Sequence, residues 1–112
     1  TLLGMRIDIR SKRPILRNNV GGMSGPAVFP IAVRMVWQVS NAVSIPVIGM
    51  GGVDSGAAAM EMMLAGVSAV QVGAAIFTDP YAPVRIVEEL QALLEEQHIA
   101  DVKELIGAVK PW

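Results

Sequence analysis

Cysteine is absent from the 112-residue sequence, which excludes a disulfide, a thiolate nucleophile and a cysteine-ligated metal within this chain. An excess of charge of one sign is also missing, because nine basic residues stand against ten acidic ones and the formal net charge is −1. The basic residues near the start are interleaved with apolar ones; they are Arg6, Arg10, Lys12, Arg13 and Arg17. We therefore expect no nucleic-acid partner.

Long hydrophobic runs are missing too, although 53% of the residues are apolar. Charged residues such as Arg34, Asp54 and Glu61 interrupt the apolar stretches well short of the ~18 residues that a membrane span needs. We expect no membrane segment, and the cytoplasm is the default location. Residues 1–6 have neither an initiator methionine nor the layout of a signal peptide, so we expect them to be an internal start.

Two short β-branched runs stand among longer segments with helical spacing. Residues 45–50 and 68–73 are typical of strands that are buried on both faces of a parallel sheet. The segments predicted to be helical are residues 30–42, a stretch that Asp54 or Ser55 caps and Gly66 closes, a turn from residue 74, residues 82–97 and a last helix that Asp101 caps through Leu105. Residues 5–9 and 14–16 flank a polar bend and predict a short antiparallel ribbon before them.

This order of elements predicts an α/β fold, since strands separated by helix-length crossovers form parallel sheets. A closed (β/α)8 barrel has about 250 residues, roughly thirty for each unit, so the chain supplies about three of eight units. A sheet this small leaves a strand edge and helix faces open. The sequence therefore predicts part of a (β/α)8 TIM barrel, either a fragment or one chain of a split barrel, with the ribbon as an excursion near the N-terminus.

Glycines follow both predicted strands: Gly51 and Gly52 after the first, and Gly73 after the second. In barrels, the loops after the seventh and eighth strands form a recurrent phosphate site with a short helix. Free N–H groups and positive helix ends attract the anion, and glycine removes the Cβ atoms that would obstruct it. We predict a phosphate cradle here that needs no lysine or arginine. The alternative is that these glycines only form the turns of an α/β fold.

Three segments resemble the dihydroorotate dehydrogenases in order and spacing, over nearly the whole chain. They are Gly21–Ala27 (GGMSGPA) with Pro30 and Ala32 downstream, Ile45–Val53 (IPVIGMGGV) and Ala65–Gly73 (AGVSAVQVG). The first two segments look most like the class 1B catalytic subunits. The resemblance implies that residues 1–112 are the C-terminal part of a single FMN-binding (β/α)8 barrel domain.

The resemblance also implies which positions bind the cofactor. Gly25 would contact FMN, Gly51 and Gly52 would bind its phosphate through peptide N–H groups, and Gly73 with Ala74 would complete the cradle. The family usually has threonine at position 74, so Ala74 is a departure. We expect phosphate binding to survive with one hydroxyl bond lost, on the order of 0.5–1.5 kcal/mol.

For the substrate, Thr1 matches the second residue of an Asn-Thr pair that holds the pyrimidine in this family. The family's cysteine base takes a proton from dihydroorotate as hydride passes to the flavin, and it lies upstream of the matching segment. The chain would then supply no catalytic residue and no metal ligand. We expect residues 1–112 alone to have no dehydrogenase activity.

The activity implied for the complete protein is oxidation of dihydroorotate to orotate in de novo pyrimidine biosynthesis. The class 1B enzymes pair a homodimer of catalytic subunits with a partner subunit that carries FAD and a 2Fe-2S cluster and reduces NAD+. The resemblance places FMN on this chain and the other two centres on the partner.

Two other functions stay open. An isomerase or aldolase acting on a sugar phosphate would share the glycine loops, but it has no reason for the GGMSGPA segment. A non-catalytic assembly module is favoured only if the gene encodes nothing before Thr1.

Several eye-catching side chains are interpreted as structural. His98 should be a solvated residue at the end of a helix, and Ser24 lacks a nearby base in the sequence to activate it. Trp37 is assigned to packing. The same interpretation covers the methionines at helical spacing (Met60, Met62, Met63), and the glutamates of the 82–97 helix should form its wet face (Glu88, Glu89, Glu95, Glu96).

Overall fold

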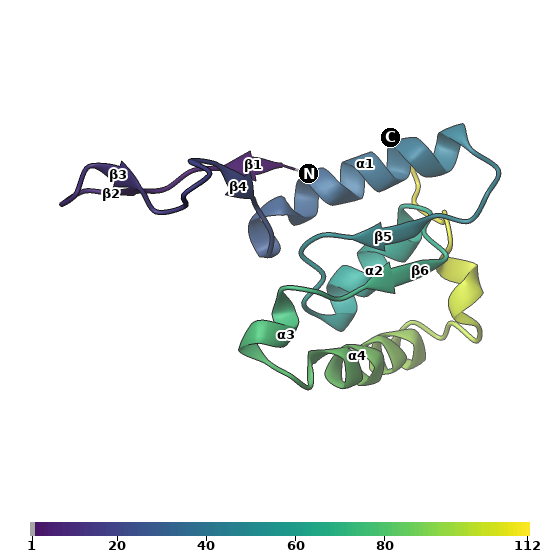
Figure 1. Ribbon diagram of the computed structural model, residues 1–112. Coiled ribbons are helices and arrows are strands. Elements are labelled where there is room, and N and C mark those ends of the chain that lie inside the picture. Colours follow the sequence, from purple (N-terminus) through teal and green to yellow (C-terminus); the bar gives the residue numbers. More distant parts are fainter. Residues whose placement is uncertain (1) are drawn as a thin grey trace.

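The computed structural model describes residues 2–112. Thr1 lies outside the described residues. The chain has two parts, an arm of residues 2–24 and a body of residues 25–112, and the arm projects away from the body (Figure 1). The principal extents are 56 × 33 × 25 Å and the radius of gyration is 16.6 Å. A compact domain of this length has a radius of gyration of about 13 Å, so the arm makes the molecule elongated.

The arm consists of two antiparallel strand pairs. Strand β2 (Ile7–Asp8) pairs with β3 (Arg13–Pro14), which confirms the predicted ribbon. Strand β1 (Leu3–Gly4) pairs with β4 (Gly21–Gly22), a contact that was not predicted. None of residues 2–24 is buried.

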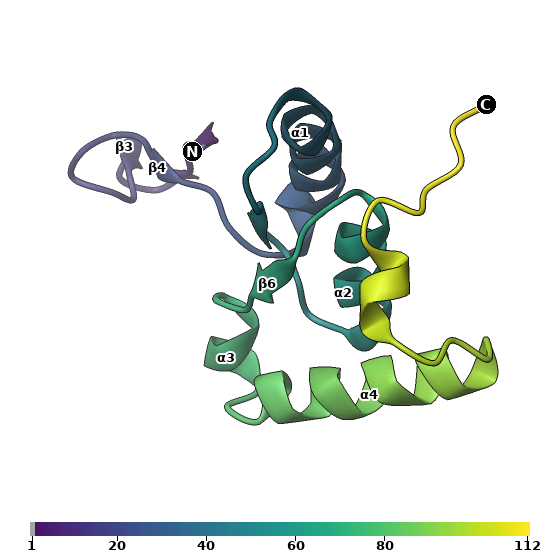
Figure 2. The same cartoon turned by 90° about the vertical axis from the view of Figure 1, so that its right-hand side faces the viewer.

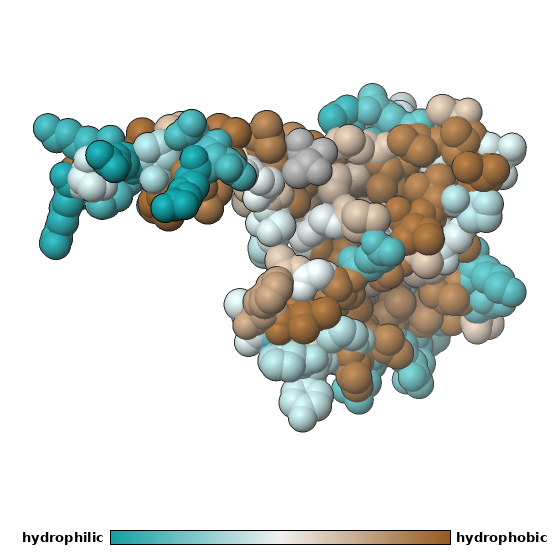
Figure 3. All heavy atoms as spheres, in the orientation of Figure 1, coloured by the Kyte–Doolittle hydropathy of each residue, from teal (hydrophilic) through white to brown (hydrophobic). Residues whose placement is uncertain are grey.

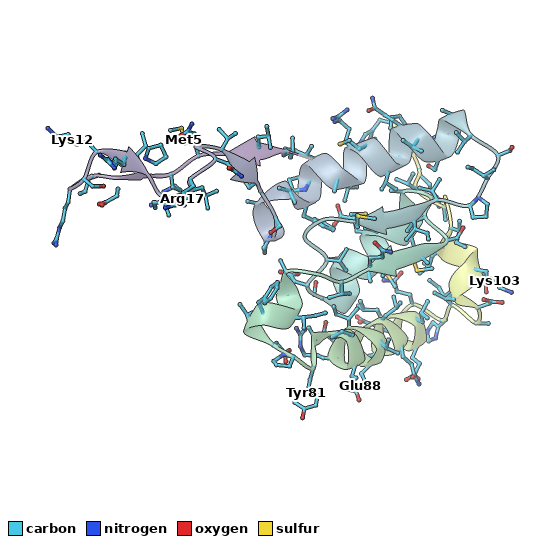
Figure 4. All side chains as sticks on the ribbon, viewed as in Figure 1. Met5, Lys12, Arg17, Tyr81, Glu88 and Lys103 are labelled. Carbon is cyan, nitrogen blue, oxygen red and sulfur yellow. The ribbon has the colours of Figure 1, made fainter. Side chains whose placement is uncertain are left out.

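Asp8 organises the bend of the ribbon. Its carboxylate accepts hydrogen bonds from the Ser11 hydroxyl at 2.7 Å and from the Arg10 N–H at 3.1 Å. These bonds lower the pKa of Asp8, with the Ser11 hydroxyl as the largest cause. The tip beyond it carries Lys12, far from Glu88 and Lys103 of the body (Figure 4). Local polar bonds, and no core, hold the ribbon in shape.

The body is built around two parallel strands. Strand β5 (Ile48–Met50) pairs with β6 (Ala69–Gln71), with Gly49 opposite Val70. Helix α2 (Gly56–Leu64) connects them, giving the predicted strand–helix–strand unit. Helix α2 packs against β6 and against α4 (Ala82–Glu96), and α1 (Phe29–Ala42) packs against β5 (Figure 2).

The remaining elements are short. A 3-10 helix, η1 (Pro26–Val28), leads into α1; α3 (Ala75–Thr78) follows β6; and η2 (Val102–Leu105) crosses the end of α2. Asp101 caps η2 by accepting a hydrogen bond from the Lys103 N–H at 2.9 Å. The predicted last helix is therefore present as a single 3-10 turn.

The core lies between the strands, α2 and α4. Met62 and Val67 are fully buried, and Ile86 of α4 is 3% exposed. Burial of side chains of this size stabilises the fold by about 1.5–3 kcal/mol each. The Ser55 hydroxyl caps α2 by accepting from the Ala58 N–H at 3.2 Å. The capping and packing of α2 follow the sequence prediction, with Ser55 rather than Asp54 as the cap.

One expectation about the strands is wrong. Strand β5 is covered on the Gly49 side only, while Ile48 and Met50 are 53% and 56% exposed. The helices lie on one side of β5 and β6, and no described element covers the other side. Figure 3 shows apolar side chains gathered over this part of the body. The exposed side is apolar because a complete barrel buries both faces of its strands, and this chain contributes only part of one. Within residues 2–112, no helix is long and apolar enough to cross a membrane.

Candidate functional site

A cavity of about 400 Å³ opens where three loops of the body meet. These are the residues before η1, the loop after β5 and the loop after β6. Because the two strands run parallel, both of their carboxyl ends face this cavity, which is the usual position of a barrel active site. We call it the glycine pocket. Its lining consists of Gly25, Pro26, Gly52, Val53, Asp54, Gly73, Ala74, Ala75, Thr78 and Arg85.

The structure brings together four of the five residues predicted to bind the cofactor. Gly25, Gly52, Gly73 and Ala74 all line the glycine pocket. Gly51 lines a neighbouring apolar cavity of about 620 Å³, so it flanks the pocket. The predicted substrate residue Thr1 lies outside the described residues.

Gly52 is glycine because the backbone is crowded there. Its φ is +75°, and a Cβ atom at this position would lie 2.8 Å from the carbonyl oxygen of Gly25 and 2.8 Å from the Cβ of Phe29. Real Cβ atoms do not approach other atoms this closely. The loop after β5 therefore rests directly on the residues that precede α1.

Gly73 presents the opposite case. A Cβ atom there would meet nothing within 4 Å, and its φ is outside the range that favours glycine. Packing among the described residues gives no reason for glycine at this position. Gly73 is exposed and lines the glycine pocket, so a side chain there would stand in open space at the pocket.

Unpaired backbone donors surround this space. Among residues 2–112, no acceptor is found for the N–H groups of Gly52, Val53, Gly73 and Ala74. Val53 is only 3% exposed, which makes an unpaired N–H there costly. Free N–H groups on residues that line one cavity suit an anion such as phosphate. The residues present therefore fit a phosphate group.

One part of the predicted mechanism is wrong, because the N-terminus of α2 is already occupied. The Gly56 N–H donates to the Glu89 carboxylate at 2.6 Å, and the Ala58 N–H donates to Ser55. These groups cannot also face a ligand. The loops before the helices, rather than the positive end of α2, offer the donors.

Glu89 also corrects the expectation of a uniformly wet glutamate face. Glu88 points away from the body (Figure 4), as predicted. The Glu89 carboxylate instead accepts from the Gly56 N–H and pairs with Arg85 at 2.6 Å. The Gly56 bond, followed by the Arg85 bond, lowers the pKa of Glu89. Glu89 joins α4 to the start of α2.

Arg85 is the pocket residue that sequence reasoning missed. Its guanidinium donates to Asp79 at 3.1 Å, to Glu89 at 2.6 Å and to the carbonyl oxygen of Asp54 at 3.2 Å. The i,i+4 spacing of Arg85 and Glu89 was the one available signal, and it normally indicates a surface pair.

The other residues considered for chemistry take no part in the pocket. His98 and Ser24 are exposed, and neither lines the cavity. Within the described residues, no group of three histidines, aspartates or glutamates could hold a metal ion.

Comparison with known proteins gives a consistent result. The sequence model of the family described as dihydroorotate dehydrogenase matches residues 1–94. The catalytic subunit of dihydroorotate dehydrogenase B (NAD(+)) from Geobacter metallireducens is 61% identical over 98% of this chain and 36% of that protein. The corresponding subunits from Geobacter sulfurreducens and Streptococcus pneumoniae are 60% and 52% identical, also over 98% of this chain.

A solved structure agrees with the sequence comparisons. The crystal structure of the Eimeria tenella dihydroorotate dehydrogenase in complex with ferulenol superposes with a TM-score of 0.76 at 26% identity, over 94% of this chain and 29% of that chain. The predicted fold class, part of a (β/α)8 barrel, is thereby confirmed. The chain spans 35–36% of the length of these curated relatives. It belongs to the dihydroorotate dehydrogenase family.

Proposed function

We propose that this chain forms the FMN-phosphate site of an NAD-linked dihydroorotate dehydrogenase, which oxidises dihydroorotate to orotate in pyrimidine biosynthesis. The observation that carries the proposal is the glycine pocket, whose lining includes four residues with unpaired N–H groups and open space at Gly73. Membership of the dihydroorotate dehydrogenase family supports the flavin phosphate as the ligand of this pocket. The proposed substrate, dihydroorotate, and the proposed acceptor, NAD+, are taken from the names of the relatives.

The binding contacts follow from the geometry. The N–H groups of Gly52, Gly73 and Ala74 would hold the phosphate oxygens, and the absent Cβ of Gly73 would let them approach. Gly25 borders the same cavity, while Gly51 flanks it. Binding would depend chiefly on these backbone N–H groups, because Arg85, the basic residue of the lining, already pairs with Asp79 and Glu89.

The chemistry would be divided between this chain and the rest of the barrel. FMN held at this site would supply the hydride acceptor for the oxidation of dihydroorotate. This chain's residues would anchor the phosphate end, and Thr1 would contact the pyrimidine. The described pocket contains no cysteine or histidine that could accept the accompanying proton. Residues 1–112, as the C-terminal part of one barrel domain, are therefore expected to bind the cofactor without turnover.

The proposal extends to the assembly of the complete protein. The relatives are called catalytic subunits, which implies a second subunit. We propose that a homodimer of catalytic subunits passes its electrons to a partner that carries FAD and a 2Fe-2S cluster, and that the complex lies in the cytoplasm. The cysteine-free sequence cannot supply ligands for the cluster.

The test uses the complete barrel protein. We expect the purified protein to carry FMN, visible in its absorbance, and to form orotate from dihydroorotate. It should bind FMN more tightly than riboflavin, which lacks the phosphate. A well-folded but colourless protein that does not distinguish the two flavins would contradict the proposal. Residues 1–112 alone serve as the control that should show no turnover.

A further inference from the structure

We infer that Arg85 is a positioning residue for the cofactor phosphate: it fastens the loop after β5 to the turn between α3 and α4, and so holds the two sides of the glycine pocket at a fixed spacing. The inference rests on the function proposed above. It assigns Arg85 and Glu89 a role in cofactor binding without a contact to the phosphate. We call the pair the Arg85–Glu89 clamp.

The guanidinium of Arg85 reaches both sides of the pocket. Nη2 donates to the carbonyl oxygen of Asp54, at the end of the loop after β5. Nε donates to Asp79, which follows α3 and whose other carboxylate oxygen accepts from the Tyr81 N–H at 3.0 Å. One planar group therefore links the loop after β5 to the residue that ends α3, the short helix that follows Gly73 and Ala74.

Glu89 secures the other end of the same loop. One carboxylate oxygen pairs with Arg85, and the second accepts from the Gly56 N–H. A Cβ atom on Gly56 would lie 2.5 Å from the Cβ of Glu89 and 2.6 Å from the Leu90 nitrogen, so the absence of a side chain lets α4 come this close. The clamp thus holds the carbonyl of Asp54 and the N–H of Gly56, on either side of Ser55.

The charges around Arg85 argue against a direct role as counter-ion of the phosphate. Two carboxylates, those of Asp79 and Glu89, already pair with the single guanidinium. Asp54 lines the pocket as well. The net charge of Arg85 and these three carboxylates is negative, so we assign the attraction of the anion to the free N–H groups rather than to Arg85.

The two roles predict opposite signs for one substitution. If Arg85 were the counter-ion, Glu89→Gln would remove a competing negative charge and tighten FMN binding. If Arg85 and Glu89 form a clamp, the same substitution loosens the loop and weakens FMN binding, even though it makes the site less negative.

The experiment measures the dissociation constants of FMN and riboflavin for the complete protein and its Arg85→Met, Glu89→Gln and doubly substituted variants. Arg34→Met is the matched control, since Arg34 is exposed on α1 and does not line the glycine pocket. We expect Arg85→Met and Glu89→Gln each to weaken FMN binding on the order of ten-fold. The double variant should be little weaker than either single one, because both changes open the same clamp. Riboflavin binding should change little in all of them.

The possible outcomes separate failure of the clamp from failure of the proposed function. Tighter FMN binding by Glu89→Gln, or unchanged FMN binding by both single variants, overturns the clamp. Equal losses for FMN and riboflavin show general damage to the fold and also overturn it. If Arg85→Met does not fold, the isosteric Glu89→Gln still decides by the sign of its effect. Failure of the unsubstituted protein to prefer FMN over riboflavin would instead overturn the proposed function.

Discussion

The two loops of the glycine pocket contain the same residue type for different physical reasons. The loop after β5 is tightly packed, and Gly52 has no room for a side chain against Gly25 and Phe29. The loop after β6 is open, and Gly73 has free space where a side chain would stand. Packing among the described residues explains glycine in the first loop, and it does not explain glycine in the second.

Substitution of Gly52 should have the largest effect of any change in these loops. Gly52→Ala introduces a Cβ atom 2.8 Å from a backbone carbonyl that cannot easily move. We expect a loss of stability of about 1–3 kcal/mol, together with loss of FMN binding. Denaturant unfolding and flavin titration of the complete protein measure the two effects. Unchanged stability would remove the contrast between the loops.

Gly73→Ala should separate binding from stability. Its Cβ atom clashes with no described residue, so the free energy of unfolding should stay within about 0.5 kcal/mol of that of the parent. FMN affinity should fall by at least about ten-fold, because the Cβ intrudes on the phosphate. Riboflavin binding is the control and should be spared. A stable variant that retains full FMN affinity would show that the pocket does not hold the phosphate here.

Ala74→Thr tests the same loop in the opposite direction. A hydroxyl at the residue before α3 adds one donor beside the free N–H of Ala74. We expect FMN to bind more tightly by on the order of 0.5–1.5 kcal/mol, with riboflavin unchanged. Equal gains for both flavins would mean that the threonine stabilises the start of α3 and does not contact the phosphate.

The smallest expected effect is the dependence of stability on pH in the acid range. The folded state lowers the pKa of Glu89 from 4.5, chiefly through the Gly56 N–H and then through Arg85. A lowered carboxyl pKa contributes stability above its ordinary value, and this contribution is lost as the pH falls through the lowered value. Unfolding of the parent and of Glu89→Gln, compared on both sides of pH 4.5, should therefore converge at the acid end. A gap between them that is independent of pH would exclude this role of ionised Glu89.

The sequence predicted the elements whose signals are local. The Ser55 cap, the apolar spacing of α2 and the polar bend at residues 11–13 each act over a few residues, and each appears in the structure. The pairing of β1 with β4 could not be predicted in this way, because Gly21 and Gly22 carry no side chains that would show a strand pattern. Their partners, Gly4 and Leu3, are also far away in the sequence.

The same distinction applies to the site. The two glycine loops are visible as strand-then-glycine patterns, but two adjacent glycines give no sign of which one faces the cavity. Arg85 escaped notice because its partner Asp54 is 31 residues away in the sequence and comes beside it through the packing of α2 against α4. Contacts made by tertiary packing leave no spacing rule in the sequence.

The uncovered side of β5 has a practical consequence for solution behaviour. Ile48 and Met50 present apolar side chains beside strand edges that no described element pairs. Such edges join to like edges, so residues 1–112 produced alone should self-associate and scatter light more strongly as their concentration rises. Adding the preceding strands of the barrel should suppress this association before any cofactor is present.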